Sequence, residues 1–506
     1  MSTISSQGRR VELDDVQGLV RFGYRHLTDA CFLLLRVKDT AAARAWLAQA
    51  PITSAVTADP LPQTALHLAF TSEGLRALGV SPDLCEQFSA EFVAGMTSDA
   101  ARARRLGDVG ANDPSGWKWG AGERLPHVAV LLYARSGRLA AWEQEIEAQC
   151  AAGFVCIERL STSATQVTEP FGFADGISQP QLDWERKRPV RDQDQLDYRN
   201  VGSLGEFLLG YPNEYGLYTP RPLLAPQHDP DGLLPRAEDA PEQADLGRNG
   251  SYLVMRQLRQ DVEGFWRELG RQAGGDADLR EHLAAKMVGR RKDGEPLEPP
   301  SEQPVADGTS KLESKLNAFT YQTDPQGLRC PLGAHIRRTN PRNADLPPGG
   351  RGVLSRLWRM LGFNAVVLEQ DLVASTRFHR LLRRGRKYGL EAAALSATEP
   401  SPGAESGIHF ICLAANIKRQ FEFVQSAWLI GSKFAGLTGE SDPLLGNRAP
   451  DLGGYPTDGF SIPQAEGPDR RLSALPQFVT VLGGAYFFLP GIRALRYLAT
   501  ASSKGS

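Results

Sequence analysis

The feature that most constrains the fold is a recurring order in which short apolar runs alternate with segments of helical character. In the first half, the apolar runs lie at residues 30–37, 65–71, 127–135 and 154–160, and an Ala-rich segment at 39–51 separates the first two. Runs of this length are typical of buried strands. The Ala-rich segment predicts a helix, because it begins with possible capping residues and stops at a proline. The first half therefore predicts an alternation of strands and helices.

The second half repeats this order. Apolar runs at 251–258, 408–415 and 478–490 predict strands, and residues 262–270 and 417–428 carry apolar side chains at helical spacing. Neither half contains a GxGxxG turn or a P-loop, so a nucleotide-binding fold would lack its phosphate-binding chemistry. Helices packed over antiparallel sheets fit the pattern better. We therefore predict an α+β fold made of two ferredoxin-like halves.

The length of the chain supports two or more domains, because 506 residues exceed the size of a typical single domain. We place an N-terminal domain at residues 1–218 and a C-terminal domain at 219–506. Residues 219–249 are rich in Pro, Asp and Gly, which indicates a boundary region or a long surface loop. Residues 271–311 are charged and Pro-rich, and they predict a solvated insertion.

Composition excludes several classes of partner. The 57 basic and 59 acidic residues give a net charge of −2, so nothing calls for nucleic acid or an anionic membrane. Six cysteines without a CxxC pair are too sparse for a disulfide framework. The N-terminal residues contain no apolar signal core, and the pair Arg9–Arg10 is followed by acidic residues instead of an apolar segment. No apolar run reaches the roughly 18 residues of a spanning helix. We expect a cytoplasmic protein.

Residues 330–343 combine one histidine with several arginines. The chain has only eight histidines, and His335 stands beside Arg337, Arg338 and Arg342. A neutral imidazole is a good ligand for iron, and guanidinium groups suit carboxylates such as the propionates of haem. The alternative is a basic surface loop with an incidental histidine, since runs of charged residues are usually solvated.

A second stretch with chemical character is GFADG, residues 172–176, which contains Asp175. Asp-Gly is a common turn dipeptide, so the pattern alone is weak. Its setting is apolar, with neighbours Phe171, Phe173, Ala174 and Ile177. A carboxylate among aromatic side chains tends to have a raised pKa, which suits a proton-transfer group near neutral pH. A third stretch, residues 377–389, contains LLRRG.

The three stretches GFADG, AHIRRTNPR and LLRRG, in this order, resemble the dye-decolorising peroxidase family. The resemblance extends to the opening DDVQGL, to GSYLVMRQLRQDVEGFW and to the closing FVTVLGGAYFFLP, and therefore covers most of the chain. It implies two ferredoxin-like domains whose antiparallel sheets form a barrel-like arrangement. It also implies one haem b per chain, held mainly by the C-terminal domain. Residues 343–376 lengthen the chain between the second and third motifs and are interpreted as an insertion.

The resemblance assigns roles to three side chains. His335 matches the proximal iron ligand, although His379 is a rival because it also lies among arginines. Asp175 matches the distal acid, which moves a proton between the two oxygens of peroxide. Arg383 matches the distal arginine, which stabilises charge on the leaving oxygen, and the adjacent Arg384 is the alternative.

Further residues are expected around the cofactor. Glu422 is a candidate hydrogen-bond partner for the far nitrogen of His335, where a carboxylate adds imidazolate character. Arg338 is the chosen propionate partner among the three arginines near His335, which the sequence does not rank. The remaining pocket residues are taken from the GFADG motif and from one strand: Phe173, Ala174, Gly176, Ile177, Ile408 and Phe410.

The resemblance implies a peroxidase that uses hydrogen peroxide to oxidise an organic reductant, phenolic or dye-like, by one-electron steps. The alternative is a haem carrier, store or sensor with incidental peroxidase activity; haem dechelation is neither supported nor excluded. Trp117 and Trp119 lie in a Gly-rich loop and are either exposed electron relays or, as we favour, partly buried loop aromatics. The sequence does not predict the oligomeric state.

Overall fold

The computed structural model describes residues 10–163, 168–187, 200–300, 316–342, 344, 375–389 and 405–500. Its centre is one antiparallel sheet in the order β10-β12-β9-β15-β2-β3-β1-β4, with β11 also paired to β12. The strands are β1 Asp29–Val37, β2 Thr64–Phe70, β3 Val128–Ala134, β4 Phe154–Ser161, β9 Ser251–Gln260, β10 Leu382–Arg383, β11 Arg386–Tyr388, β12 Gly407–Ala414 and β15 Val479–Leu489.

Each half of this sheet has ferredoxin-like topology. In the first, α1 (Thr40–Gln49) follows β1, α6 (Leu139–Cys150) follows β3, and the strand order is β4-β1-β3-β2. In the second, α7 (Val262–Gln272) follows β9, a π-helical segment over 418–430 follows β12, and the order is β10-β12-β9-β15. The predicted α+β fold with two similar halves is therefore confirmed. The halves join where Phe488 of β15 lies opposite Phe70 of β2.

The sheet curls so that strands distant in its order meet. The ring of Phe32 on β1 lies 6.0 Å from the ring of His409 on β12, although four strands separate them in the sheet. Just beyond β4, the amide of Ser163 donates a hydrogen bond of 2.9 Å to the carbonyl of Lys387 in β11. The two ends of the sheet therefore approach each other, which gives the barrel-like form that the sequence predicts. One face of the sheet lines this interior.

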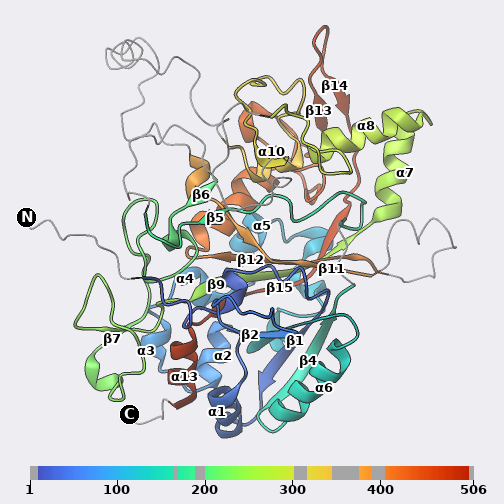
Figure 1. Cartoon of the computed structure of the whole chain (residues 1–506). Helices are drawn as coiled ribbons and strands as arrows, with labels where there is room; N and C mark the ends of the chain where they lie inside the picture. The colour runs from blue at the N-terminus through green and yellow to red at the C-terminus, as the bar shows by residue number, and fades with distance from the viewer. Residues whose placement is uncertain are drawn as a thin grey trace, which may run out of the picture.

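Helices cover the outer face in two groups (Figure 1). The group that contains α1, α6 and the C-terminal α13 lies below the sheet in this view, and α7, α8 and α10 lie above it. The remaining elements are α2 Ser72–Ala77, α3 Pro82–Cys85, α4 Ala90–Ala94, α5 Ala100–Leu106, α8 Ala277–Val288, α10 His335–Thr339, α13 Ile492–Thr500, β5 Gln181–Leu182, β6 Val201–Gly202, β7 Leu223–Leu224, β8 Ala244–Asp245, β13 Phe460–Ile462 and β14 Arg470–Leu472. No helix in the described ranges is long and apolar enough to cross a membrane.

Part of the expected solvated insertion is a packed helix. Residues 277–288 form α8, and Leu283 and Met287 are buried in a core with Phe265 of α7. The apolar residues of this segment recur at helical spacing among charged ones, so its high charge describes only the outer face of the helix. Residues 301–311 and nearly all of 343–376 lie outside the described residues.

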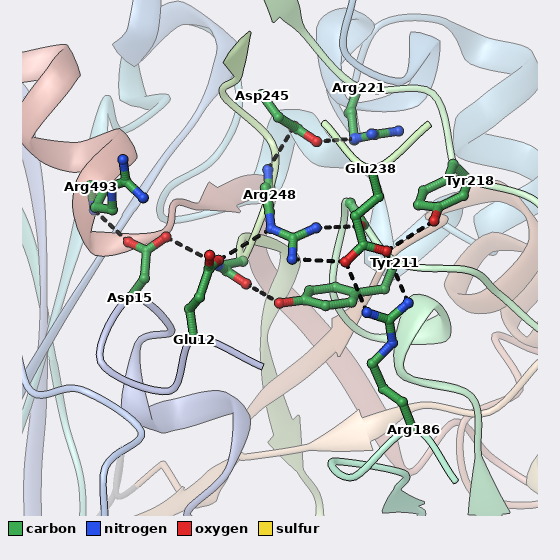
Figure 2. Close-up of polar contacts among 12 residues, drawn as sticks. Glu12, Asp15, Arg186, Tyr211, Tyr218, Arg221, Glu238, Asp245, Arg248 and Arg493 are labelled. Carbon is green, nitrogen blue, oxygen red and sulfur yellow. Dashed lines mark hydrogen bonds and ion pairs between the residues drawn. The ribbon is translucent and has the colours of Figure 1, made fainter. Parts of the chain in front are cut away.

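Residues 219–249 are mostly irregular backbone, as expected of a long loop, but part of the segment is anchored by buried charges. Arg248 is 2% exposed, and its guanidinium donates to Glu12 at 3.2 Å and to Glu238 at 3.0 Å. Arg221 donates at 2.6 Å to Asp245, which also accepts from the amide of Arg248 (Figure 2). This buried charge network attaches the segment to the N-terminal residues. The predicted domain boundary at 218/219 stays a prediction.

Candidate active site

His335 is held by a carboxylate that lies far away in the sequence. It begins α10, and its Nδ1 lies 3.0 Å from Oδ2 of Asp442. Asp442 is fully buried, and its other oxygen accepts the amides of Leu444 and Leu445 at 2.9 and 2.8 Å. Burial alone would raise the pKa of Asp442, but the charge and hydrogen bond of His335 and the charge of Arg338 lower it below its ordinary value.

This contact fixes the tautomer of His335. An ionised carboxylate only accepts hydrogen bonds, so the proton of the neutral imidazole is on Nδ1 and the lone pair is on Nε2. Nε2 has no hydrogen-bond partner among the described residues. These residues also contain no group of three His, Cys, Asp or Glu side chains placed to hold a metal ion. One imidazole therefore suits an iron whose other ligands a porphyrin already supplies.

The GFADG loop is positioned by a partly buried glutamate that precedes it. Glu169 accepts the amides of Phe171 and Phe173 at 3.0 and 2.9 Å, and Nε2 of Gln260 donates to it at 2.8 Å. Gly172 has a φ of +97°, which only glycine adopts without strain. The bonds to Glu169 and the backbone conformation of Gly172 fix the loop, so the backbone sets the direction of the Asp175 side chain.

Asp175 and Arg383 come together as a partly exposed pair instead of lying inside an apolar core. Nη1 of Arg383 lies 4.0 Å from Oδ1 of Asp175, and the two side chains are 39% and 51% exposed. The expected apolar setting of the acid is wrong, because Phe171 and Phe173 turn into the core under α7. The paired acid and guanidinium thus remain accessible to a small polar substrate.

Neighbouring arginines have different tasks. Nη2 of Arg383 donates to the carbonyl of Ser178 at 3.0 Å, and its amide donates to Oε1 of Gln179 at 2.9 Å, which joins β10 to the end of the GFADG loop. Arg384 points the other way and donates to the carbonyls of Leu19 and Val20. Of the two, Arg383 is the one that lies beside Asp175.

Register places two apolar residues on the same face as Arg383. Arg383 pairs with Cys412 of β12, and Ile408 and Phe410 share the face of Cys412 because side chains alternate along a strand. Both are partly exposed although β12 is an interior strand, whereas His409 between them is buried. A partly exposed apolar face beside an acid–arginine pair fits a flat, largely apolar group such as a porphyrin.

The GFADG loop and the segment of His335 are linked by a short chain of contacts. Nδ2 of Asn317 donates to the carbonyl of Ile177 at 2.7 Å, and Arg342 donates to the carbonyl of Asn317 at 2.9 Å. The guanidinium of Arg290 donates to the carbonyl of Leu316 at 2.9 Å and to Oδ1 of Asn317 at 3.2 Å, so Arg290 lies beside this link. The structure therefore brings the acid loop, β10 and the α10 segment into one region.

Known proteins similar to this chain include dye-decolorising peroxidases. No protein-family model matches the chain. A curated dye-decolorizing peroxidase of Mycena epipterygia is 27% identical over 97% of this chain and 88% of its own length. A multifunctional dye peroxidase of Amycolatopsis sp. is 28% identical over 86% and 82%. A solved ancestral D-type dye decolorizing peroxidase aligns with a TM-score of 0.71 and 25% identity over 96% and 99%.

Over most of its length the chain is similar in sequence and in structure to dye-decolorising peroxidases. It is therefore an enzyme, a peroxidase of this type, which implies a haem cofactor and, as substrates, peroxide and a reductant. The donor set described above fits that cofactor: one imidazole with a free lone pair, an acid beside a guanidinium, and an apolar face.

Two expectations about this peroxidase site are wrong. Glu422 does not contact His335; its Oε1 instead accepts Tyr486 Oη at 2.9 Å and lies 3.3 Å from Nε of Arg102. Arg338 is fully buried, and its guanidinium donates to four backbone carbonyls, those of Gly333, Trp428, Gly431 and Glu440. Four of the five N–H groups of this guanidinium are used by backbone carbonyls, and its full burial keeps the remaining one from an outside carboxylate such as a propionate.

Other candidates are placed as follows. His379 stacks on Phe423 with ring centroids 3.8 Å apart, and its Nδ1 faces the carbonyl of Arg419, so it is part of local packing. Phe173 is 4% exposed and stacks on Trp266, whereas Ala174, Gly176 and Ile177 are partly exposed. Trp117 and Trp119 are fully buried, which excludes the exposed alternative.

Sequence reasoning missed Asp442 and Glu169. Asp442 precedes a proline, and its side chain accepts the amides of Leu444 and Leu445. The sequence therefore indicates a turn at Asp442 but not its contact with a histidine. Glu169 stands three residues before the first glycine of GFADG, where a carboxylate suits a turn with exposed amides. That spacing is a signal that could have been used.

Proposed function

We propose that this chain is a haem b peroxidase with one haem per chain, bound through Nε2 of His335, which reduces hydrogen peroxide and oxidises phenolic or dye-like donors. The observation that carries the proposal is the pair Asp175–Arg383, 4.0 Å apart and accessible, in the same region as a histidine whose Nδ1 is fixed by a buried carboxylate. Simple storage or transport of haem requires neither the acid nor the arginine.

Each side chain has one task in this proposal. Haem supplies the redox-active iron at which peroxide is reduced. Asp175 takes a proton from one peroxide oxygen and returns it to the other, for which its exposed carboxylate is placed. Arg383 stabilises negative charge on the departing oxygen, and its bond to Ser178 holds the guanidinium in position. Asp442 keeps the proton of His335 on Nδ1, so that Nε2 remains a ligand.

The donors are inferred from the relatives, which are named for the decolorisation of dyes. Phenols belong to the same chemical class of donor, since they also give up one electron with one proton. The cytoplasmic location inferred from composition remains a proposal, which fractionation of cells that produce the protein would test.

The experiment mixes haem-loaded protein with one equivalent of hydrogen peroxide in a stopped-flow spectrometer and follows the haem absorption. We expect a fast spectral change in the parent and a loss of at least about 10³-fold in rate for the double variant Asp175→Asn/Arg383→Leu. His335→Ala should lose the haem absorption band itself. A double variant as fast as the parent would favour the alternative, a haem carrier with incidental activity.

A further inference from the structure

Four successive carbonyl groups follow Asp175 in the chain, and each accepts a hydrogen bond from a side chain of a different segment. The bonds run from Nη2 of Arg25 to Gly176 at 2.7 Å, from Nδ2 of Asn317 to Ile177 at 2.7 Å, from Nη2 of Arg383 to Ser178 at 3.0 Å and from Nδ2 of Asn200 to Gln179 at 2.8 Å. We call residues 176–179 the anchored segment. Asp175 directly precedes it, so the place of the acid depends on how firmly this segment is held.

The carboxylate of Asp175 is not fixed by packing. Its side chain is 51% exposed, and Oδ1 accepts the amide of Gly176 at 2.6 Å and lies 4.0 Å from Nη1 of Arg383. Arg383 is itself 39% exposed, and water weakens contacts between groups that are exposed to this degree. The backbone that follows Asp175 is therefore what keeps the acid beside the arginine.

Asn317 is the buried donor among the four. It is 7% exposed, whereas Arg25 is exposed and Arg383 and Asn200 are partly exposed. Water can replace an exposed donor, but the loss of a buried donor leaves its carbonyl unpaired where water has little access. The bond from Asn317 to the carbonyl of Ile177 is therefore the one that the anchored segment can least replace.

The amide group of Asn317 is oriented by two buried arginines. Nη2 of Arg290 donates to its Oδ1 at 3.2 Å, and Nη1 of Arg342 donates to its backbone carbonyl at 2.9 Å. Arg290 and Arg342 are 6% and 3% exposed, and Nη1 of Arg290 is held by the carbonyl of Gly294 at 2.7 Å. Because Oδ1 accepts from Arg290, Nδ2 is turned towards the carbonyl of Ile177.

We propose that Asn317 is a positioning residue for the reaction with peroxide, which holds the anchored segment so that the carboxylate of Asp175 stays beside the guanidinium of Arg383. This inference rests on the proposed peroxidase function, because it requires the acid and the arginine to act together. Asn317 acts through the backbone of Ile177 and not on the substrate. Peroxide has two adjacent oxygens, so a displacement of the acid by about 1 Å can lower the rate about 100-fold.

The first test replaces the amide of Asn317. Asn317→Asp keeps the size of the side chain and the acceptor for Arg290, but it places a second oxygen against the carbonyl of Ile177. We expect the stopped-flow reaction of the haem-loaded enzyme with hydrogen peroxide to slow by about 10- to 100-fold, with the absorption of the resting enzyme unchanged. Asn317→Ser removes the amide without adding a charge, should slow the reaction similarly, and serves if Asn317→Asp does not fold.

The second test asks whether Asn317 acts through Asp175. In an Asp175→Asn background there is no acid left to position, so adding Asn317→Asp should lower the rate by less than about twofold further. Hydrogen exchange of the haem-loaded protein gives a reading that does not depend on activity. Amides of residues 176–179 should exchange at least about tenfold faster in Asn317→Asp than in the parent, and those of β9 should not change.

The matched control is Asn112→Asp, the same substitution at another buried asparagine. Asn112 is 3% exposed; its Nδ2 donates to the carbonyl of Gly107 at 3.3 Å, and its Oδ1 accepts the amide of Val481 at 3.0 Å. This residue joins the turn at 110–112 to β15 and has no bond to the anchored segment among the contacts described here. Its variant should react with peroxide at the parental rate even if it is less stable.

Three results would overturn the inference: parental rates in both Asn317 variants, a full additional loss in the Asp175→Asn background, or unchanged exchange at residues 176–179. Asp175→Asn alone separates two failures. If that variant reacts as fast as the parent, the proposed peroxidase role of the acid is wrong. If it is slow while both Asn317 variants are fast, only the role of Asn317 is wrong.

Discussion

Oδ2 of Asp442 lies 3.0 Å from Nδ1 of His335, and this contact joins residues that are 107 positions apart in the chain. A carboxylate in this position makes the imidazole a stronger electron donor to a metal. In the proposed haem complex, the strength of the bond between His335 and iron would therefore depend on a residue outside all three sequence motifs.

Replacing Asp442 with Asn should weaken that donation. We expect the iron–histidine stretch in the resonance Raman spectrum of the ferrous enzyme to move to lower frequency, and the reaction with peroxide to slow by about 10- to 100-fold. Glu422→Gln is the control, because Glu422 contacts Tyr486 and Arg102 instead. A shift in the control but not in Asp442→Asn would contradict the structure.

Substitution of Arg383 should affect activity, whereas substitution of the adjacent Arg384 should affect stability. Arg383→Leu removes the guanidinium beside Asp175, so the rate of the peroxide reaction should fall by about 10²- to 10³-fold with little change in unfolding. Arg384→Leu leaves the carbonyls of Leu19 and Val20 without their donor and should lower the free energy of unfolding by about 2–4 kcal/mol. Stopped-flow and urea unfolding measure the two effects; equal kinetic losses in both variants would contradict this division.

Local patterns were sufficient for the fold and for part of the site. Apolar runs and helical spacing predicted the strands of both halves, because these signals depend on residues close in sequence. The motifs identified His335, Asp175 and Arg383, and the structure brings Asp175 and Arg383 together. The resemblance favoured Arg383 over Arg384, and the structure places Arg383 beside Asp175, whereas Arg384 donates to the carbonyls of Leu19 and Val20.

Partners of buried polar groups could not be predicted in this way. The helical spacing around Glu422 predicted that this residue lies on a helix. It did not predict the neighbours of its side chain, which come from α5 and β15. Arg338 looked like a solvated or propionate-binding arginine because sequence does not show that four carbonyls surround it. Such contacts join distant segments, so they depend on the tertiary fold.

Arg338 should be a determinant of stability. Arg338→Met removes the donor of four buried carbonyls and a charge near Asp442, so the free energy of unfolding should fall by about 3–5 kcal/mol. Arg291→Met is the matched control, because Arg291 is exposed, and it should change stability by no more than about 0.5 kcal/mol. Urea unfolding of the haem-free proteins measures both changes. An Arg338→Met variant that is normally stable but has lost haem binding would show that our account of this residue is wrong.

His67 should make the fold less stable in acid. Its pKa is about 3 in the fold, below the ordinary value of 6.5, so between these values the unfolded chain binds more protons than the folded chain. The stability that comes from a neutral His67 is therefore complete above pH 6.5 and is lost as the pH falls towards 3. Between pH 7.5 and pH 5 this loss is about 2 kcal/mol.

Urea unfolding of His67→Leu at pH 7.5 and at pH 5 should show a decrease in stability that is smaller than the parental decrease by this amount. Tyr133→Phe changes a ring whose centroid lies 6.1 Å from that of His67 without removing the imidazole, so its pH dependence should match that of the parent. Parallel curves for His67→Leu and the parent would mean that the fold does not keep the imidazole neutral.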